Sequence, residues 1–162
     1  MFIKNFKFQS ALLYGGILTL FLADRVFKIF FIKNPAAKRF FLFLSFALTK
    51  NNGIAFGLPV NNILLNAIVF LFIIILSMLF LNIMNVAEYV NAEGNIRRYA
   101  KVVIFLILLA AISNFIDRAL YGAVIDYIEL PYFVSLNIAD IMITTGFFLI
   151  ASNYILGKMK IK

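Results

Sequence analysis

The chain has 162 residues, a length that suits one domain. Hydrophobic residues make up 64% of it and charged residues only 14%. A soluble chain of this size cannot bury so much apolar surface, since soluble proteins average nearer about 45–50% apolar and about 25% charged. The net charge is +8, with basic residues flanking the apolar stretches. We therefore expect membrane lipids as partners and no nucleic acid.

The chain contains no cysteine and no histidine. This excludes disulfides, thiolate nucleophiles and the Ser-His and Cys-His triads, and it argues against a catalytic zinc site. We expect neither a metal nor a cofactor. The remaining acid/base candidates are the seven carboxylates, the lysines and the tyrosines.

Four apolar stretches are each long enough to cross a hydrocarbon core, which takes about 20 helical residues. They predict helices at about 11–32, 63–87, 101–120 and 132–156. The first stretch can also be read as a cleavable signal peptide, but it is long for one and lacks a small-residue cleavage site before its charges. We predict a single all-α membrane domain, residues 1–162, built as a four-transmembrane-helix bundle.

The segment 39–58, between the first two helices, is not helical in pattern. It is rich in phenylalanine and contains Asn51-Asn52-Gly53, a turn signal between two β-prone stretches. We expect a small extracytoplasmic β-sheet or hairpin here, seated by its aromatic residues at the headgroup level.

The basic residues also indicate an orientation. An even number of spans puts both termini on one side, where the tails and the loop between spans two and three carry eight lysines and arginines. The other side carries four outside the polar motifs. This excess predicts cytoplasmic termini in a multi-pass cell membrane protein.

Polar residues gather toward the extracytoplasmic half when the four helices alternate in direction. Each of three sets falls on one helix face: the first is Asp24 with Lys28, the second Asn114 with Asp117 and Arg118, the third Asn137 with Asp140. Asp126 is expected in the short outer connection or in a helix extension.

Structural readings stand beside these functional ones. Asp24–Lys28 can be an ion pair near the headgroups, Asp117–Arg118 a helix-end ion pair and Asn137 interhelical glue. Asn51 to Gly53 can be a turn alone, and Asp126 a solvated loop carboxylate. Asp140 is harder to dismiss, because it lies in an apolar run with no lysine or arginine within one helical turn.

Two carboxylates are sufficient machinery for amide hydrolysis. The reaction needs a base to activate water and an acid to protonate the leaving nitrogen. A pair of aspartates sharing one proton supplies both, because like charges a few ångströms apart cannot both ionise. Asp126 and Asp140, fourteen positions apart, are the candidates.

Four ordered blocks of the chain resemble lipoprotein signal peptidase, the signal peptidase II family of aspartyl intramembrane peptidases. The blocks are Asp24-x-x-x-Lys28, Asn51-x-Gly53-x-Ala55-Phe56, Asn114-x-x-Asp117-Arg118-x-x-x-Gly122-x-Val124-x-Asp126 and Asn137-x-Ala139-Asp140. The chain departs from the family pattern at four positions next to the motif residues. The family commonly has serine at Gly57, glycine at Ser113, and phenylalanine at both Tyr127 and Leu136.

The resemblance implies a function and a set of roles. Asp126 and Asp140 correspond to the catalytic pair. Asn51, Asn114 and Arg118 would hold the substrate backbone, and Asn137 would support the pair. Asp24, Lys28 and Asp117 would brace the site, whose active face is extracytoplasmic. The implied substrates are lipid-modified prolipoproteins, cut before a diacylglyceryl-modified cysteine by an enzyme expected to be a monomer.

Three other classes stay open at this point. A small transporter or channel subunit can use such aspartates to bind a cation or a proton. A non-catalytic assembly protein is a second reading, although it leaves the two unpaired aspartates unexplained. A protease with Ser113 as nucleophile and Lys28 as base is the third.

Overall fold

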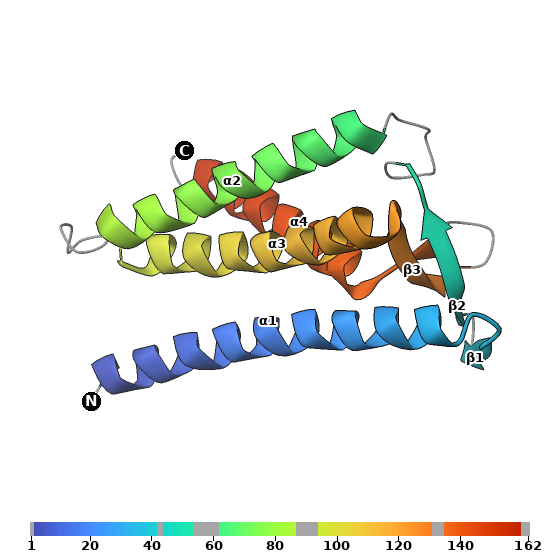
Figure 1. The fold of residues 1–162 in the computed structure, drawn as a ribbon. Coiled ribbons are helices and arrows are strands. Elements are labelled where there is room, and N and C mark those ends of the chain that lie inside the picture. The colour runs from blue at the N-terminus through green and yellow to red at the C-terminus, as the bar shows by residue number, and fades with distance from the viewer. Residues whose placement is uncertain (1, 42–43, 54–61, 87–93, 131–134, 160–162) are drawn as a thin grey trace.

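Four long helices and a small sheet make up the part of the chain that the structure, a computed structural model, describes: residues 2–41, 44–53, 62–86, 94–130 and 135–159. The helices are α1 (Phe2–Lys33), α2 (Asn62–Val86), α3 (Gly94–Tyr121) and α4 (Ile138–Met159). The strands are β1 (Arg39–Phe41), β2 (Leu44–Asn51), β3 (Val124–Glu129) and β4 (Ser135–Leu136). The helices run side by side, and the sheet lies at the end of the bundle away from both chain termini (Figure 1).

The described residues contain four helices in the predicted order, but not all of the predicted bounds are right. α1 begins at Phe2 and α3 at Gly94, earlier than predicted, because hydropathy detects only the apolar part of a helix that continues into polar sequence. α4 begins at Ile138 and not at Tyr132, because residues 135–136 pair with β3 as the strand β4.

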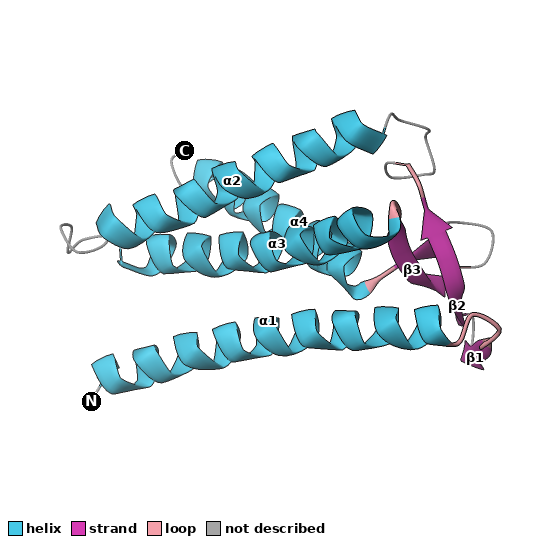
Figure 2. Cartoon of the chain, in the orientation of Figure 1, coloured by secondary structure: helices cyan, strands magenta, loops and turns pink. Residues whose placement is uncertain are grey.

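The sheet has the strand order β1-β2-β3-β4, and all its pairs are antiparallel (Figure 2). The predicted β segment at 39–58 is confirmed for β1 and β2, but half of the sheet comes from the α3–α4 connection. Asp126 therefore lies in the connection between α3 and α4, one of the two expected places, but this connection is folded as β3, with Thr49 of β2 opposite Asp126. The alternative of a helix extension is wrong. Long-range pairing with β2 makes this segment a strand.

The Asn51-Asn52-Gly53 segment is confirmed as a turn, but within the described residues it does not join two paired strands as a hairpin loop. β2 ends at Asn51, whose Oδ1 accepts a hydrogen bond of 3.1 Å from the Gly53 amide, a local side-chain turn. The β2 strand pairs instead with β1 and β3. The second β-prone stretch of the prediction, after Gly53, lies outside the described residues.

α3 is the central helix and packs against the other three. Its buried face is built from Val103, Ile107 and Ala110. Gly146 of α4 faces Ile107 so closely that a Cβ there would lie 2.4 Å from Ile107 Cγ1. Small residues therefore set the spacing of α3 and α4, as is common where helices approach in a bilayer.

The outer surface of the bundle is apolar. On α2, Leu71 and Met78 are 57% and 66% exposed. Ile63–Asn82 of α2 and Tyr99–Tyr121 of α3, with mean hydropathies of 3.0 and 2.2, are long and apolar enough to cross a membrane. Only 11% of the α2 stretch is buried within the protein, which fits a lipid-facing helix. The four-span count stays a prediction for α1 and α4.

Gly122 turns the chain from α3 into β3. Its φ of +73° is in the left-handed region, which favours glycine, and its amide donates to Arg118 O at 3.1 Å to close the helix. This turn brings Asp126, four residues later, back onto the bundle.

Candidate active site

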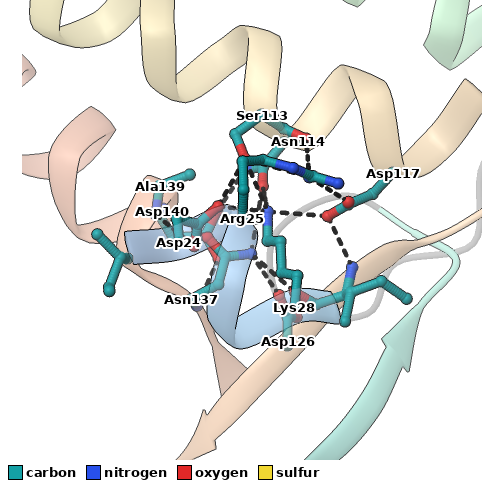
Figure 3. Close-up of polar contacts among 12 residues, drawn as sticks. Asp24, Arg25, Lys28, Ser113, Asn114, Asp117, Asp126, Asn137, Ala139 and Asp140 are labelled. Carbon is teal, nitrogen blue, oxygen red and sulfur yellow. Dashed lines mark hydrogen bonds and ion pairs between the residues drawn. The ribbon is translucent and has the colours of Figure 1, made fainter. Parts of the chain in front are cut away.

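The polar residues singled out in the sequence meet where α1, α3, α4 and β3 come together, at the sheet end of the bundle (Figures 1 and 3). Asp24 comes from α1, Asp117 from α3, Asp126 from β3 and Asp140 from the first turn of α4. Asp126 is 1% exposed, whereas Asp140 is only half-buried. One residue of the predicted pair is therefore enclosed and the other is partly exposed.

Asn137 links the two carboxylates. Its Nδ2 donates to Asp126 Oδ1 at 2.7 Å, and its backbone amide donates to Asp140 Oδ2 at 3.2 Å. Asn137 is fully buried, so this link has a fixed geometry. Figure 3 shows it between the two aspartates.

The sequence Asn137-Ile-Ala-Asp140 forms a reciprocal cap at the start of α4. Asn137 Oδ1 accepts from the Asp140 amide at 2.9 Å while Asp140 Oδ2 accepts from the Asn137 amide. This is the arrangement of a capping box, with an aspartate at the third helical position. Local sequence thus fixes the Asp140 carboxylate relative to the helix start.

Asn114 connects Asp140 to the buried side chain of Lys28. Its Nδ2 donates to Asp140 Oδ1 at 2.8 Å, and its Oδ1 accepts from Lys28 Nζ at 2.8 Å and from Asn137 Nδ2 at 3.2 Å. Both oxygens of Asp140 therefore accept hydrogen bonds.

Lys28 is fully buried and lies between two carboxylates. Its Nζ is 2.8 Å from both Asp24 Oδ2 and Asp117 Oδ2, and all three side chains are 0% exposed. Arg25 forms a second ion pair with Asp117 and also donates to Ser113 O at 3.1 Å. Asp117 Oδ2 further accepts from the Ile125 amide at 3.2 Å, which ties the start of β3 to α3.

The turn after β2 closes the other side of Asp126. Asn51 Nδ2 donates to Asp126 Oδ2 at 3.3 Å, and Arg118 donates to Gly53 O at 2.9 Å. Arg118 therefore contacts the protein's own backbone here. All ten predicted site residues belong to one connected network, and their individual roles stay predictions.

The electrostatic environment of Asp126 suits a proton carrier. Burial, followed by the charge of Asp140, raises the pKa of Asp126 to about 7, against the lowering effect of hydrogen bonds from Asn137 and Asn51. At neutral pH this carboxyl is therefore partly protonated, as expected of one member of a coupled pair.

Sequence reasoning missed three contributors to the network. Arg25 was not singled out, although it directly follows Asp24. Tyr127 was noted only as a departure from the family pattern, and Ser113 as a departure and as an alternative nucleophile, but both hydroxyls bond to Asp24, at 2.9 and 2.6 Å. Hydroxyl groups in such positions carry no sequence signal of their own, because the partner lies on another element.

The geometry bears on the serine–lysine alternative. Ser113 Oγ is fully buried and donates to Asp24, while the Lys28 ammonium is engaged by two carboxylates and by Asn114. Lys28 Nζ also lies 3.4 Å from Ser113 Oγ, but the serine has no exposed surface through which a substrate could reach it. Among the residues that the structure describes, no group of three or more acidic side chains is arranged to hold a metal ion.

Comparison with known proteins identifies the family. The family model for signal peptidase (SPase) II matches residues 16–156, most of the chain. The chain therefore belongs to the signal peptidase II family and is a peptidase of that type.

Individual relatives agree. Lipoprotein signal peptidase of Pelagibacter ubique is 33% identical over 160 residues, covering 90% of this chain and 86% of the relative. That of Rickettsia bellii is 30% identical over 155 residues, covering 90% and 76%. Two solved structures, each described as a bacterial membrane enzyme, are 26% identical to the chain. Their TM-scores are 0.76 and 0.62, with coverage of 95% and 90% of this chain and 92% of each of theirs.

Proposed function

We propose that this chain is an aspartic endopeptidase that removes signal peptides from diacylglyceryl-modified prolipoproteins, cutting before the lipidated cysteine. The observation that carries the proposal is the pairing of Asp126 and Asp140 through the buried Asn137. Family membership supports the reaction and the substrate class.

Asp140 is assigned as the base and Asp126 as the acid. Asp140 is half-buried, so water can reach it, and it takes a proton from the attacking water. Asp126, with a pKa of about 7, holds the proton that passes to the substrate. The water oxygen bonds to the scissile carbonyl carbon, the C–N bond breaks, and Asp126 gives its proton to the leaving nitrogen. The proton gained at Asp140 balances the one given up by Asp126, and no metal or cofactor is needed.

The remaining site residues support this pair. Asn137 and Asn114 orient the two carboxylates, and Asn51 holds Asp126 from the sheet side. Arg118 lies beside the carboxylate pair, and we assign it to the substrate backbone.

The fold suits a multi-pass protein of a bacterial cell membrane. The four helices have 32, 25, 28 and 22 residues. At 1.5 Å per residue each exceeds a hydrocarbon core of about 30 Å. Both termini lie at the end opposite the sheet (Figure 1). With that end cytoplasmic, the site faces the extracytoplasmic leaflet, where we expect a monomer to meet the precursor.

The test is cleavage of a diacylglyceryl-modified prolipoprotein by the purified full chain in lipid. Wild type, Asp126→Asn and Asp140→Asn are compared, since asparagine keeps the volume and removes the acid/base function. Glu129→Gln is the matched control, because Glu129 lies on the same strand three residues beyond Asp126 and bonds to Ser45.

We expect wild type and Glu129→Gln to cut before the lipidated cysteine and both aspartate variants to be inactive while still folded. A precursor with an unmodified cysteine should stay intact. Wild-type protein that cuts no lipidated precursor, or an active Asp140→Asn variant, would refute the proposal and favour a cation- or proton-binding protein.

A further inference from the structure

The first turn of α4, which carries Asp140, is held partly by groups outside α4. A helix start leaves four amide groups without partners inside the helix. Two of them are satisfied within this turn, because the Asp140 amide donates to Asn137 Oδ1 and the Asn137 amide donates to Asp140 Oδ2. The Ile138 amide donates to the Tyr127 hydroxyl at 3.1 Å, and the Ala139 amide donates to Asp24 Oδ1 at 3.3 Å.

These two external acceptors are joined to each other. The Tyr127 hydroxyl donates to Asp24 Oδ1 at 2.9 Å, and the Ser113 hydroxyl donates to Asp24 Oδ2 at 2.6 Å. Each oxygen of Asp24 therefore receives one hydroxyl, one from β3 and one from α3. Lys28 Nζ, 2.8 Å from Oδ2, provides the charge but comes from the same helix as Asp24. The two hydroxyls, together with the Ala139 amide of α4, tie the Asp24 carboxylate to the elements around it.

The Tyr127 hydroxyl can be removed without disturbing the ring. The ring stacks on Phe31 at a centroid distance of 5.7 Å and on Phe27 at 5.5 Å, contacts that a phenylalanine also makes. Burial, followed by the charge of Asp24, raises the pKa of Tyr127, so the phenol stays a donor at any working pH. Tyr127→Phe is therefore a deletion of one donor and acceptor.

We propose that Tyr127 and Ser113 are positioning residues, whose hydroxyls hold the Asp24 carboxylate against the first turn of α4 and so set the place of Asp140 relative to Asp126. The proposal rests on the proposed function, since it concerns the same carboxylate pair. Neither residue touches the reacting atoms. Ser113 acts through Asp24, and Tyr127 acts through Asp24 and through its bond to the Ile138 amide.

The expected effect is a reduced rate with unchanged substrate binding. Tyr127→Phe leaves the half-buried Ile138 amide without its acceptor and loosens one oxygen of Asp24. Misplacement of a catalytic group by a fraction of an ångström lowers the chemical rate without altering distant substrate contacts. Because Asn137 still caps the helix, the loss should be partial. We expect kcat to fall roughly tenfold while KM changes less than twofold.

The control is Tyr99→Phe. The Tyr99 hydroxyl donates to Leu149 O at 3.0 Å and links α3 to α4 away from the site. This variant also loses a tyrosine hydroxyl that joins two elements of the bundle, α3 and α4, but it leaves the first turn of α4 intact. Thermal unfolding of both variants shows whether their stability losses are comparable.

A second variant tests whether the two hydroxyls act through the same carboxylate, that of Asp24. Ser113→Ala removes the hydroxyl on the other oxygen of Asp24. If both hydroxyls act through that carboxylate, the double variant Ser113→Ala/Tyr127→Phe loses less in kcat than the product of the two single losses.

The experiment measures kcat and KM with the lipidated precursor, for full-length protein in lipid. A fall in kcat for Tyr127→Phe but not for Tyr99→Phe, with a sub-multiplicative double variant, supports the proposal. Equal kcat values for the two tyrosine variants, a change confined to KM, or multiplicative losses overturn it. Inactive wild-type protein would instead refute the proposed function, so the two failures are distinguishable.

Discussion

Replacing Lys28 by methionine tests whether the buried charge network holds the bundle together. The Lys28 ammonium is within 2.8 Å of Asp24, Asp117 and Asn114, and its side chain is fully buried. Methionine keeps most of the volume but removes the charge. Asp117 retains its ion pair with Arg25, so Asp24 is the carboxylate that loses its ion-pair partner.

The expected cost is large. Removing one partner of a buried ion pair costs about 3–5 kcal/mol, because the other charge is left buried and uncompensated. On the scaling of domains of 150–250 residues this lowers Tm by about 6–20 °C. The matched control is Lys38→Met. Lys38 forms an ion pair with Glu129 at 3.8 Å, and its side chain is 54% exposed. Such surface pairs contribute about 0–1 kcal/mol.

The assay is thermal unfolding followed by far-UV circular dichroism in detergent, since the chain has no tryptophan and no cysteine to report. A second variant, Lys28→Met/Asp24→Asn, removes both charges and should recover much of the lost stability. The reasoning is refuted if Lys28→Met melts like Lys38→Met, or if the double variant is no more stable than Lys28→Met alone.

Three further predictions concern the same fold. The Asp126 pKa of about 7 lies above its usual 3.8, so the folded state binds the extra proton and stability falls as pH rises from about 4 to 7. Asp126→Asn removes this loss, and its Tm gain over wild type should be larger at pH 8 than at pH 5; equal gains would contradict the assignment. Gly146→Ala places a Cβ 2.4 Å from Ile107 Cγ1 and should cost roughly 1–3 kcal/mol in chemical unfolding, whereas Gly15→Ala, with nothing within 4 Å, should cost none. Gly122→Ala forces a Cβ onto a φ of +73° and should cost about 1–2 kcal/mol, with an unchanged Tm as the contrary result.

The sequence by itself determined the features that depend on neighbours along the chain. Helical spacing predicted that Asp24 and Lys28 share a face, and the structure pairs them at 2.8 Å. It likewise predicted that Asn137 and Asp140 share a face, and they cap the start of α4 reciprocally. Composition predicted the apolar helices. Such features follow from the 3.6-residue period and from hydropathy, both of which are local.

Tertiary structure decided where Asp126 lies and what holds it. The hydropathy pattern placed residue 126 in a connection between helices. Pairing with β2 folds this connection as a strand, and Asn51 of β2, 75 residues earlier in the chain, bonds to Asp126. The same holds for Tyr127 and Ser113, whose hydroxyls meet on Asp24 from two other elements. Strand pairing and buried hydrogen bonds of this kind join residues far apart in the chain. No local propensity specifies these interactions, because they form, and stabilise the fold, only once α1, α3, β3 and α4 have packed together.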